Sequence, residues 1–600
     1  MMKMARFFVL GLLLLPLSLW AQMDLMTFSR QGGCYESSFD LFIGCSQGNH
    51  IRYTINGSTP TAQSALYDSL LHLDETLFSP SHIHTIVNCI PSIFYPVDDV
   101  KHAIVIRAAA FDEDENCVSP VVTNTYCIKE LGCDLHGLPV LSIVTDSLNL
   151  FDYDTGIFVP GASYNPIDSF LTGNYNLRGR EWERPINMEF YEPDNQGVNQ
   201  QCGLRTHGGA SRWFQQKGMR IYARDEYGKK HFTHRFFETT HNAKFKHLNL
   251  HPFRCSNWLQ TGGQDYLAQR IAANMDIDCL AVRETVVFIN GEYWGIYTLE
   301  ESPDERYLED HYGVNLDEVN ILKYWGVPQY GDPTEWREIY SWMYTADLTQ
   351  PEDSAYAYEH IDVPSFIDYI LLETFSANLD WPQNNVMLWQ PAIGQPFRLI
   401  FYDGDGCFTW PDYEAMYHAT HAGGNSVILN AFMKNTSFCE AFYQRYMQLR
   451  GSHLSYSSMK QELDYYGETV EGEIESQAER FLFPYSKQQW EEDMVKADEF
   501  LRLRYTYYEP EWEWGVGEHP ASAGTLACYP NPTEGSFMVS LEGMADGEAE
   551  IEVFDMTGRK VSSRDIILNE GENRFVMDEQ LPSGLYLIRV GALSQRIVIK

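Results

Sequence analysis

The period of the hydrophobic pattern changes twice along this chain of 600 residues. Residues 26–130 and 526–600 contain short segments in which apolar and polar side chains alternate, as in half-buried strands. A helical period occurs only within residues 138–505, where it is mixed with strand-like segments. One hydrophobic core cannot hold a chain of this length, so three or four domains are expected. The pattern therefore predicts two β-domains flanking one large α+β domain.

Residues 1–21 have the pattern of a signal peptide. Lys3 and Arg6 precede an apolar run from Phe7 to Leu15, and the small residue Ala21 stands at a plausible cleavage point. The run is too short to cross a bilayer as a helix. We therefore expect an exported protein whose mature chain has no transmembrane helix.

Composition limits the partners of the protein. The formal net charge is −40 at pH 7, which argues against a nucleic-acid partner because phosphate backbones select Lys and Arg. Any phosphate chemistry must therefore use a local basic pocket. The 12 cysteines include no CxxC pair, so a zinc cage is not expected. Disulfides are permitted in an exported chain, although their pairing cannot be deduced from the sequence.

The first β-domain, residues 26–130, is expected to be a β-sandwich. The stretch "HIRYTINGSTPT" alternates apolar and polar residues and then breaks at Asn56-Gly57, a strong turn signal. The longer stretch "IRYTINGSTPTAQSALYD" resembles the immunoglobulin-like module appended to chitobiases and other exported bacterial enzymes. The resemblance implies a spacer or a binding module without catalysis.

A linker at residues 506–525, rich in Pro, Gly and Glu, precedes the second β-domain, which is expected to be a small β-sandwich. Four motifs follow in order: "YPNPTEGSF", "VFDMTGRKV", "LPSGLYLIRV" and "RIVIK". Together they closely resemble the C-terminal sorting domain of the Bacteroidetes type IX secretion system. The resemblance implies recognition by that machinery, passage through the periplasm and outer membrane, and attachment to the cell surface or release.

Within the central domain, "CGLRTHGGASRWFQQKGMRIYAR" contains a glycine turn between two expected strands. Small residues at Gly208, Gly209 and Ser211 would let backbone N–H groups approach phosphates, and Lys217 could neutralise them. The alternative is an ordinary glycine hairpin with a surface lysine. A second tight turn, Asn290-Gly291, lies further along between two apolar strands.

Two acidic segments complete a possible catalytic set. Asp380 and Asn385 lie just past an apolar helix, where a carboxylate can accept a proton and an amide oxygen can bind a cation. An apolar strand then delivers Asp403 and Asp405, which are hard oxygen ligands suited to Mg²⁺ with substrate phosphates. One alternative for the first pair is a turn-forming Asp and a helix-capping Asn.

The alternative for the second pair is a calcium loop. Asp403, Asp405 and Glu414 fall on EF-hand-like positions, but Cys407 and Phe408 stand where a ligand and a glycine are needed.

The order of these parts, a glycine turn, a lysine, an Asp–Asn loop and an acidic strand end, is that of a protein kinase. The His-Arg-Asp and Asp-Phe-Gly signatures of ordinary kinases are absent. The domain instead resembles the CotH kinase family in six stretches: "LPVLSIVTDSLNLFDYDTGIFVPG", "GREWERPINMEFYE", "CGLRTHGGASRWFQQKGMRIYAR", "GQDYLAQRIAANMDIDCLAVRETVVFINGEYWGIYTLEE", "NLDWPQNNVMLW" and "FYDGDGCF". The resemblance implies an atypical protein-kinase-like fold that transfers phosphate from ATP, with Mg²⁺, to protein Ser or Thr.

The resemblance also implies roles for individual residues. Asp380 matches the catalytic-loop aspartate, Asn385 the neighbouring metal-binding asparagine, and Asp403 the aspartate that holds the metal against the phosphates. The separation from Asp380 favours Asp403 over Asp405, although both could bind the metal. Lys217 corresponds to the phosphate lysine.

The glutamate partner of Lys217 is left open between Glu300 and Glu301. The expected function is therefore an exported kinase acting on a surface or secreted protein. The alternative is a catalytically silent kinase-like binding protein that holds Ca²⁺. A hydrolase is not favoured, since no defensible Ser-His-Asp or paired-carboxylate pattern is present.

Overall fold

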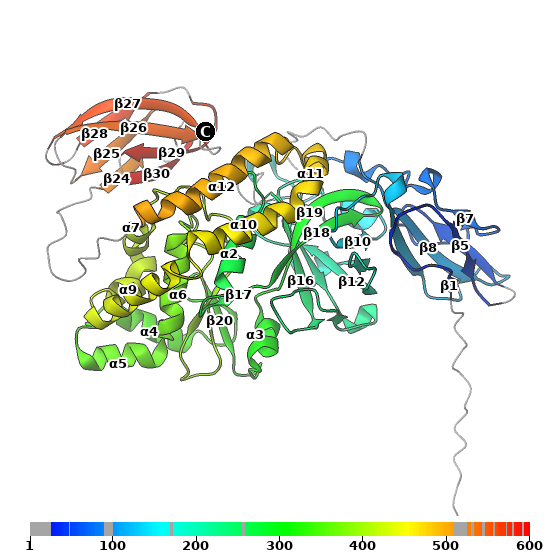
Figure 1. Ribbon diagram of the computed structural model, residues 1–600, viewed down its shortest axis with the longest axis horizontal. Helices are drawn as coiled ribbons and strands as arrows, with labels where there is room; N and C mark the ends of the chain where they lie inside the picture. The colour runs from blue at the N-terminus through cyan, green and yellow to red at the C-terminus, as the bar shows by residue number, and fades with distance from the viewer. Residues whose placement is uncertain are drawn as a thin grey trace, which may run out of the picture.

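The computed structural model describes residues 26–46, 49–88, 100–168, 172–254 and 259–508, and residues 525–599 apart from short gaps. The expected signal peptide and most of the expected linker lie outside these residues. The described chain is multidomain, with a sheet-rich N-terminal region, a large central domain with helices, and a C-terminal sheet domain (Figure 1).

The N-terminal region contains one five-stranded sheet, in the order β2-β9-β8-β5-β6, and two two-stranded sheets. Its strands are β1 (Thr27–Phe28), β2 (Gly33–Tyr35), β3 (Asp40–Leu41), β4 (Ile43–Gly44), β5 (His50–Thr54), β6 (Ala65–Leu66), β7 (Leu71–His72), β8 (Ile104–Phe111) and β9 (Val122–Ile128). Asn56-Gly57 lies in a turn after β5, as expected, but the next strand begins only at Ala65. A Cβ on Gly57 would lie 2.2 Å from the Asn290 side chain.

The N-terminal region is joined to the central domain by buried polar contacts. The Glu292 carboxylate, fully buried, accepts hydrogen bonds from the backbone N–H groups of Ile83 and His84, each at 2.8 Å. The Lys101 ammonium lies 2.8 Å from the buried Glu473 carboxylate. Because buried charges are costly unless they are paired, these contacts favour one arrangement of the two parts.

The central domain begins with a closed seven-stranded barrel, in the order β10-β11-β12-β13-β16-β19-β18. Its strands are β10 (Val140–Val144), β11 (Arg184–Tyr191), β12 (Gly197–Thr206), β13 (Met219–Tyr222), β16 (His247–Pro252), β18 (Val282–Ile289) and β19 (Glu292–Glu300). The short strands β14 (Phe232–Thr233) and β15 (Lys244–Phe245) pair beside it. The expected strands are present. Their hydrophobic pattern did not show that the barrel closes, because closure depends on parallel pairing between β10 and β18, which lie far apart in the sequence.

Alternation along the barrel strands separates an apolar interior from a polar face. Leu248 and Leu250 of β16 are buried in the barrel core. Asn249 and His251 therefore point to the opposite side of the strand. Arg220 of β13 pairs in register with Asn249, so it lies on the same side. We name this row, Arg220, Asn249 and His251, the polar barrel face; it forms one wall of the candidate site.

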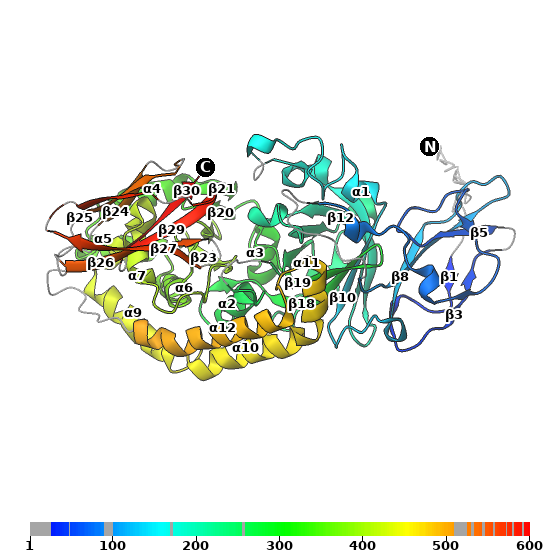
Figure 2. The same cartoon turned by 90° about the horizontal axis from the view of Figure 1, so that it is seen from above.

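A second, five-stranded sheet follows, in the order β17-β23-β22-β20-β21. Its strands are β17 (Asp278–Cys279), β20 (Asn320–Lys323), β21 (Val327–Tyr330), β22 (Met387–Gln390) and β23 (Arg398–Phe401). The helices of the central domain are α1 (Leu148–Phe151), α2 (Gln264–Ala272), α3 (Glu305–Tyr312), α4 (Thr334–Met343), α5 (Pro351–His360), α6 (Val363–Phe375), α7 (Ala415–Thr420), α8 (Val427–Phe432), α9 (Thr436–Arg450), α10 (Tyr456–Val470), α11 (Ile474–Phe481) and α12 (Lys487–Tyr507). Figures 1 and 2 show α10 and α12 side by side along the domain.

Helix α6 is at the centre of the largest hydrophobic core, and nearly all of its side chains are buried. Its first turn is capped by Asp362, whose carboxylate accepts from the Ser365 N–H at 3.2 Å. The helical period of the sequence runs through residues 458–481, but a 3-10 turn (Glu471–Glu473) separates α10 from α11. That turn contains the Glu473 carboxylate that binds Lys101.

The C-terminal domain consists of two antiparallel sheets, β24-β25-β28 and β27-β26-β29-β30. Its strands are β24 (Thr525–Tyr529), β25 (Phe537–Glu542), β26 (Gly547–Asp555), β27 (Lys560–Leu568), β28 (Asn573–Met577), β29 (Gly584–Val590) and β30 (Leu593–Ile599). Side chains from both sheets share one hydrophobic core, including Val539, Ile551 and Ile588. Among the described residues, no helix has both the length and the apolar character needed to span a bilayer.

Candidate active site

Two loops that follow α6 and β23 are locked together by backbone hydrogen bonds. The Phe408 N–H donates to the Ser376 carbonyl at 2.7 Å, and the Leu379 N–H donates to the Gly406 carbonyl at 3.2 Å. A Cβ on Gly406 would lie 2.6 Å from the Asn378 side chain, so glycine permits this close approach. The first loop contains Asp380, and the second contains the acidic residues that follow β23, so these groups are held in one site.

Asn385 is directly connected to the acidic loop. Its side-chain nitrogen donates to the Asp403 carbonyl at 3.1 Å. Both residues have left-handed backbone conformations, with φ of 57° and 62°, which Asn and Asp tolerate better than most residues. The amide nitrogen is used in this hydrogen bond, so the amide oxygen is the Asn385 atom suited to a cation.

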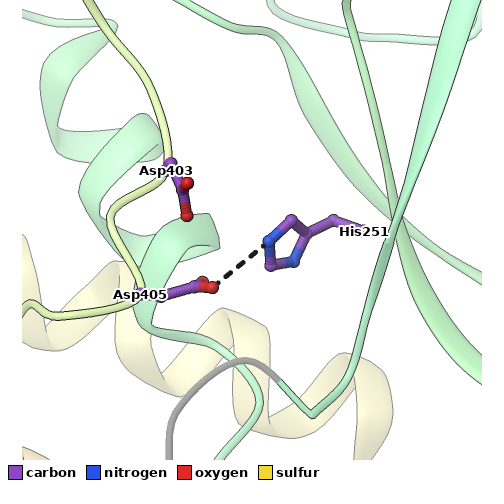
Figure 3. Close-up of side chains that lie close together, drawn as sticks. All are labelled: His251, Asp403 and Asp405. Carbon is purple, nitrogen blue, oxygen red and sulfur yellow. Dashed lines mark ion pairs between the residues drawn. The ribbon is translucent and has the colours of Figure 1, made fainter. Parts of the chain in front are cut away.

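His251, Asp403 and Asp405 converge from two parts of the domain. Within the described chain, their ligand atoms all lie within 4.8 Å of one another, and they form one group that could hold a metal ion. The closest nitrogen–oxygen pair, His251 Nε2 and Asp405 Oδ2, is 3.4 Å apart. Figure 3 shows the imidazole reaching from the barrel toward two carboxylates on one loop.

A further carboxylate, Asp265 of α2, lies under this group. It is 3% exposed, and its Oδ1 accepts from the Gly404 N–H at 2.7 Å. Its Oδ2 and the Asp405 Oδ1 are buried without a hydrogen-bond partner. Buried anionic oxygens are costly when unpaired. These oxygens therefore fit a site for a divalent cation, which would supply the missing positive charge.

The pKa values of the site show the same excess of negative charge. Burial and the neighbouring Asp405 raise the pKa of Asp403 well above its usual value. Burial also raises the pKa of Glu300, hydrogen-bonded to Asn249 of the polar barrel face, to about 7. For His251, burial alone would lower the pKa, but Asp405 and the nearby acids outweigh it and raise the pKa well above the ordinary histidine value.

Lys323 lies near Asp403, and Arg220 and Arg178 lie near Lys323. The Lys323 ammonium, at the end of β20, is 4.9 Å from the centre of the Tyr402 ring. Burial, with Arg220 and Arg178 nearby, lowers its pKa to about 8, although Asp403 acts in the opposite direction. Within the described chain, Lys323 forms no ion pair. Unpaired cations in so acidic a protein favour binding of an anion.

Arg220 is positioned on the polar barrel face by neutral partners. Its Nε donates to the Asn249 Oδ1 at 2.7 Å, and its Nη2 lies 3.0 Å from the His207 ring nitrogen. Burial, together with Arg220 and Arg212, lowers the pKa of His207 well below its usual value. This histidine is therefore neutral at physiological pH, and the guanidinium keeps its full charge for an anionic ligand.

Lys217 lies elsewhere in the barrel. It is fully buried, and its ammonium donates to the carbonyls of Arg212 and Phe214 at 3.0 and 2.9 Å. It also lies 4.2 Å from the centre of the Tyr175 ring. These contacts direct the ammonium into its own loop, and the geometry does not bring it into the group around Asp403.

The glycine turn is the loop between β12 and β13. Gly208 has φ of 96°, and its carbonyl accepts from Arg212 Nε at 2.7 Å. The Ser211 hydroxyl donates to the His207 carbonyl at 3.1 Å. Gly209 is exposed, and a Cβ there would meet no atom within 4 Å. The turn thus stabilises itself through internal hydrogen bonds and leaves its tip open.

The other acidic candidates have separate partners. The Glu300 carboxylate accepts from Asn249 at 3.2 Å, whereas Glu301 pairs with His311 at 2.9 Å. Glu414 precedes α7 and is not in the metal-competent group of the described chain. The arrangement around Asp403 therefore differs from an EF-hand loop, in which one continuous segment supplies the ligands.

Sequence reasoning missed four contributors to the site: His251, Asp265, Arg220 and Lys323. The first two come from stretches with a readable signal. Asn249 and His251 are polar residues with strand spacing between leucines, and Asp265 is a charge on the buried side of a helix. These signals showed which faces the residues occupy, but not that the faces meet.

Three family models match the chain. The CotH kinase protein model matches residues 204–508, the secretion system C-terminal sorting domain matches residues 527–600, and the Fn3 associated model matches residues 41–126. The first match begins within β12, so the first two barrel strands precede it. The sorting domain shows that the protein is exported to the cell surface or secreted.

Comparison with other proteins adds little. No curated protein matches the chain. Dimeric latent PorU from Porphyromonas gingivalis is 19% identical over 14% of this chain and 10% of that chain, with a TM-score of 0.13. The Helicobacter pylori proinflammatory kinase CtkA is 8% identical over 46% of this chain and 90% of that chain, with a TM-score of 0.23. Neither likeness supports an inference about this chain.

The CotH kinase match covers most of the residues of the candidate site. The matched residues include the Asp380 loop, Asn385 and the Asp403 loop, and the match extends over more than half of the chain. The chain therefore belongs to the CotH kinase family.

Proposed function

We propose that the protein transfers the γ-phosphate of ATP to a Ser or Thr hydroxyl of a surface or secreted protein. One observation carries the proposal: the cation-competent group that includes Asp403 and Asp405 lies in one site with Asp380 and with Lys323, a cation that forms no ion pair in the described chain. Phosphoryl transfer needs these parts together, because catalysis rests on positioning and on stabilising the phosphate charge.

In this proposal Asp380 orients the substrate hydroxyl and accepts its proton. Asn385, Asp403 and Asp405 would hold a divalent cation such as Mg²⁺, which supplies charge stabilisation to the phosphates when bound. The orphaned oxygens of Asp405 and Asp265 support this fit. The hydrogen bonds between the two loops keep Asp380 in place relative to the metal ligands.

Lys323 and Arg220 are the proposed phosphate-binding cations. Lys323 lies near Asp403, and Arg220 lies near Lys323. Neither forms an ion pair in the described chain, whereas the Lys217 ammonium already binds two carbonyls. The phosphate role of Lys217 and of the Gly208–Ser211 turn stays a prediction. The open tip at Gly209, where a Cβ would meet no atom within 4 Å, supports contact with a phosphate there.

The division of the chain is part of the same proposal. We assign residues 26–130 and 526–600 to β-sandwich modules and residues 138–505 to the kinase-like domain, with residues 506–525 as a linker. The shared core between the two C-terminal sheets supports this reading for the second module. The type IX secretion machinery is the proposed partner of that module.

The full mature protein, incubated with γ-labelled ATP, a divalent cation and surface proteins, tests the proposal. Label should enter a Ser or Thr of a protein substrate, and Asp380→Asn should abolish incorporation while leaving nucleotide binding intact. Equal incorporation by the two proteins would contradict the mechanism. Calcium binding without measurable ATP binding would instead support the silent binding protein.

A further inference from the structure

The candidate metal group includes His251, although the roles proposed for the Asp380 and Asp403 loops in phosphate transfer need no histidine ligand. His251 lies on β16 of the barrel, whereas Asp403 and Asp405 follow β23 of the second sheet. The strand alternation that buries Leu250 in the barrel core turns His251 outward, toward the carboxylates. Its Nε2 is the ring nitrogen that lies closest to Asp405, at 3.4 Å.

We propose that His251 is a metal ligand and that, with Asp403 and Asp405, it makes this a site for a transition-metal ion such as Mn²⁺. Imidazole nitrogen binds divalent first-row transition metals, while Mg²⁺ prefers oxygen ligands and keeps several waters. Mn²⁺ accepts both the imidazole and the two carboxylates. The inference deepens the proposed function by naming its metal, but its test detects coordination directly.

An ion pair between His251 and Asp405 alone would not explain the unpartnered carboxylate oxygens beside it. That pair uses Asp405 Oδ2 and leaves Asp405 Oδ1 buried without a partner. Asp265, 3% exposed, also has an unpartnered Oδ2 beside this loop. One imidazolium cannot neutralise the half-buried Asp403 and Asp405 together with the buried Asp265. A doubly charged ion would neutralise more of them and leave Asp265 to support the loop through Gly404.

A metal bound in this way would connect two parts of the central domain. The ligands come from the barrel and from the loop after β23, and no one strand or loop holds them all. Loading the metal should therefore raise the thermal unfolding temperature, because an ion that binds only the assembled site stabilises the folded state. The same increase should be absent from a variant that cannot coordinate the ion.

Pulsed electron paramagnetic resonance of the Mn²⁺-loaded full protein, purified without a histidine tag and without nucleotide, tests the inference. We expect the electron spin echo to be modulated by a directly coordinated imidazole nitrogen. His251→Gln should lose this modulation and bind Mn²⁺ about tenfold more weakly or worse. His247→Gln, on the same strand but paired with Asp304, should retain both properties.

Mn²⁺ binding without nitrogen modulation in the wild type would overturn the inference, as would unchanged Mn²⁺ affinity in a folded His251→Gln protein. Failure to bind Mn²⁺ at all would also overturn it and would identify the group as an ion pair only. The result is separable from the proposed function. Nitrogen modulation without phosphate transfer would support the metal site and contradict the kinase activity. Phosphate transfer with Mg²⁺, without nitrogen modulation in the Mn²⁺-loaded protein, would support the kinase activity and contradict the metal site.

Discussion

Replacing Lys323 with Met is expected to weaken ATP binding by about 100-fold, the equivalent of about 3 kcal/mol. The ammonium forms no ion pair among the described residues, so the substitution removes a ligand contact without breaking a salt bridge of the protein. Methionine keeps the length and apolar contacts of the side chain near Tyr402. Titration with a fluorescent nucleotide measures the affinity.

The same lysine should make nucleotide binding depend on pH. Its pKa is lowered to about 8 by burial and by nearby arginines. The phosphates favour the protonated form, so affinity should be full below this pKa. Above about pH 8, Lys323 must take up a proton when the nucleotide binds. The nucleotide affinity should therefore fall with rising pH, by up to about tenfold per pH unit. Lys323→Met should lose this dependence in the window from about pH 8 upward.

Lys460→Met is a suitable control, because that lysine lies on α10 and pairs with Asp464 on the same helix. Its nucleotide affinity and pH profile should match those of the wild type. Unchanged affinity in Lys323→Met, or a wild-type profile that stays flat through pH 8–9, would remove Lys323 from the proposed phosphate site.

Arg504→Met should destabilise the central domain by about 3–5 kcal/mol. Arg504 of α12 is 1% exposed, and its guanidinium donates to four carbonyls at 2.6–2.8 Å. Two of these belong to Thr374 and Phe375, in the last turn of α6, where carbonyls have few helical donors; Thr374 also accepts from the Ala377 N–H at 3.3 Å. Methionine would remove one donor from each carbonyl. Among the described residues, those of Phe375 and Pro411 would lose their hydrogen bond, whereas those of Thr374 and Tyr413 would keep the N–H groups of Ala377 and Ala415.

Urea unfolding followed by tryptophan fluorescence measures this loss. Arg502→Met is the matched control, because Arg502 is exposed on the same helix and pairs only loosely with Glu499, at 3.7 Å. A surface pair of this kind contributes little, so the control should stay within about 0.5 kcal/mol of the wild type. If both variants unfold alike, Arg504 does not hold the end of α6, and the Asp380 loop must be positioned by other contacts.

Much of the local structure was predictable. The helix before Asp380 and the strand before Asp403 are present as α6 and β23, because long buried segments carry clear hydrophobic patterns. The structure also places Asn385 against Asp403. The assignment of Lys217 to the phosphates rested on the glycine turn, the order of the motifs and the family resemblance, and it stays a prediction. Order along a strand does not reveal which way a side chain points, and this ammonium points into its own loop.

By itself, the sequence determined the three-part organisation, the export signal in the C-terminal motifs and the identity of Asp380 and Asp403 as candidate catalytic residues. Only the tertiary structure decided that the barrel closes, that His251 and Arg220 share its polar face, and that Lys323 lies near Asp403. The physical reason is that periodicity records which face of an element is buried, a local property. Which faces meet depends on contacts between residues far apart in the chain, and the metal and phosphate sites are made of such contacts.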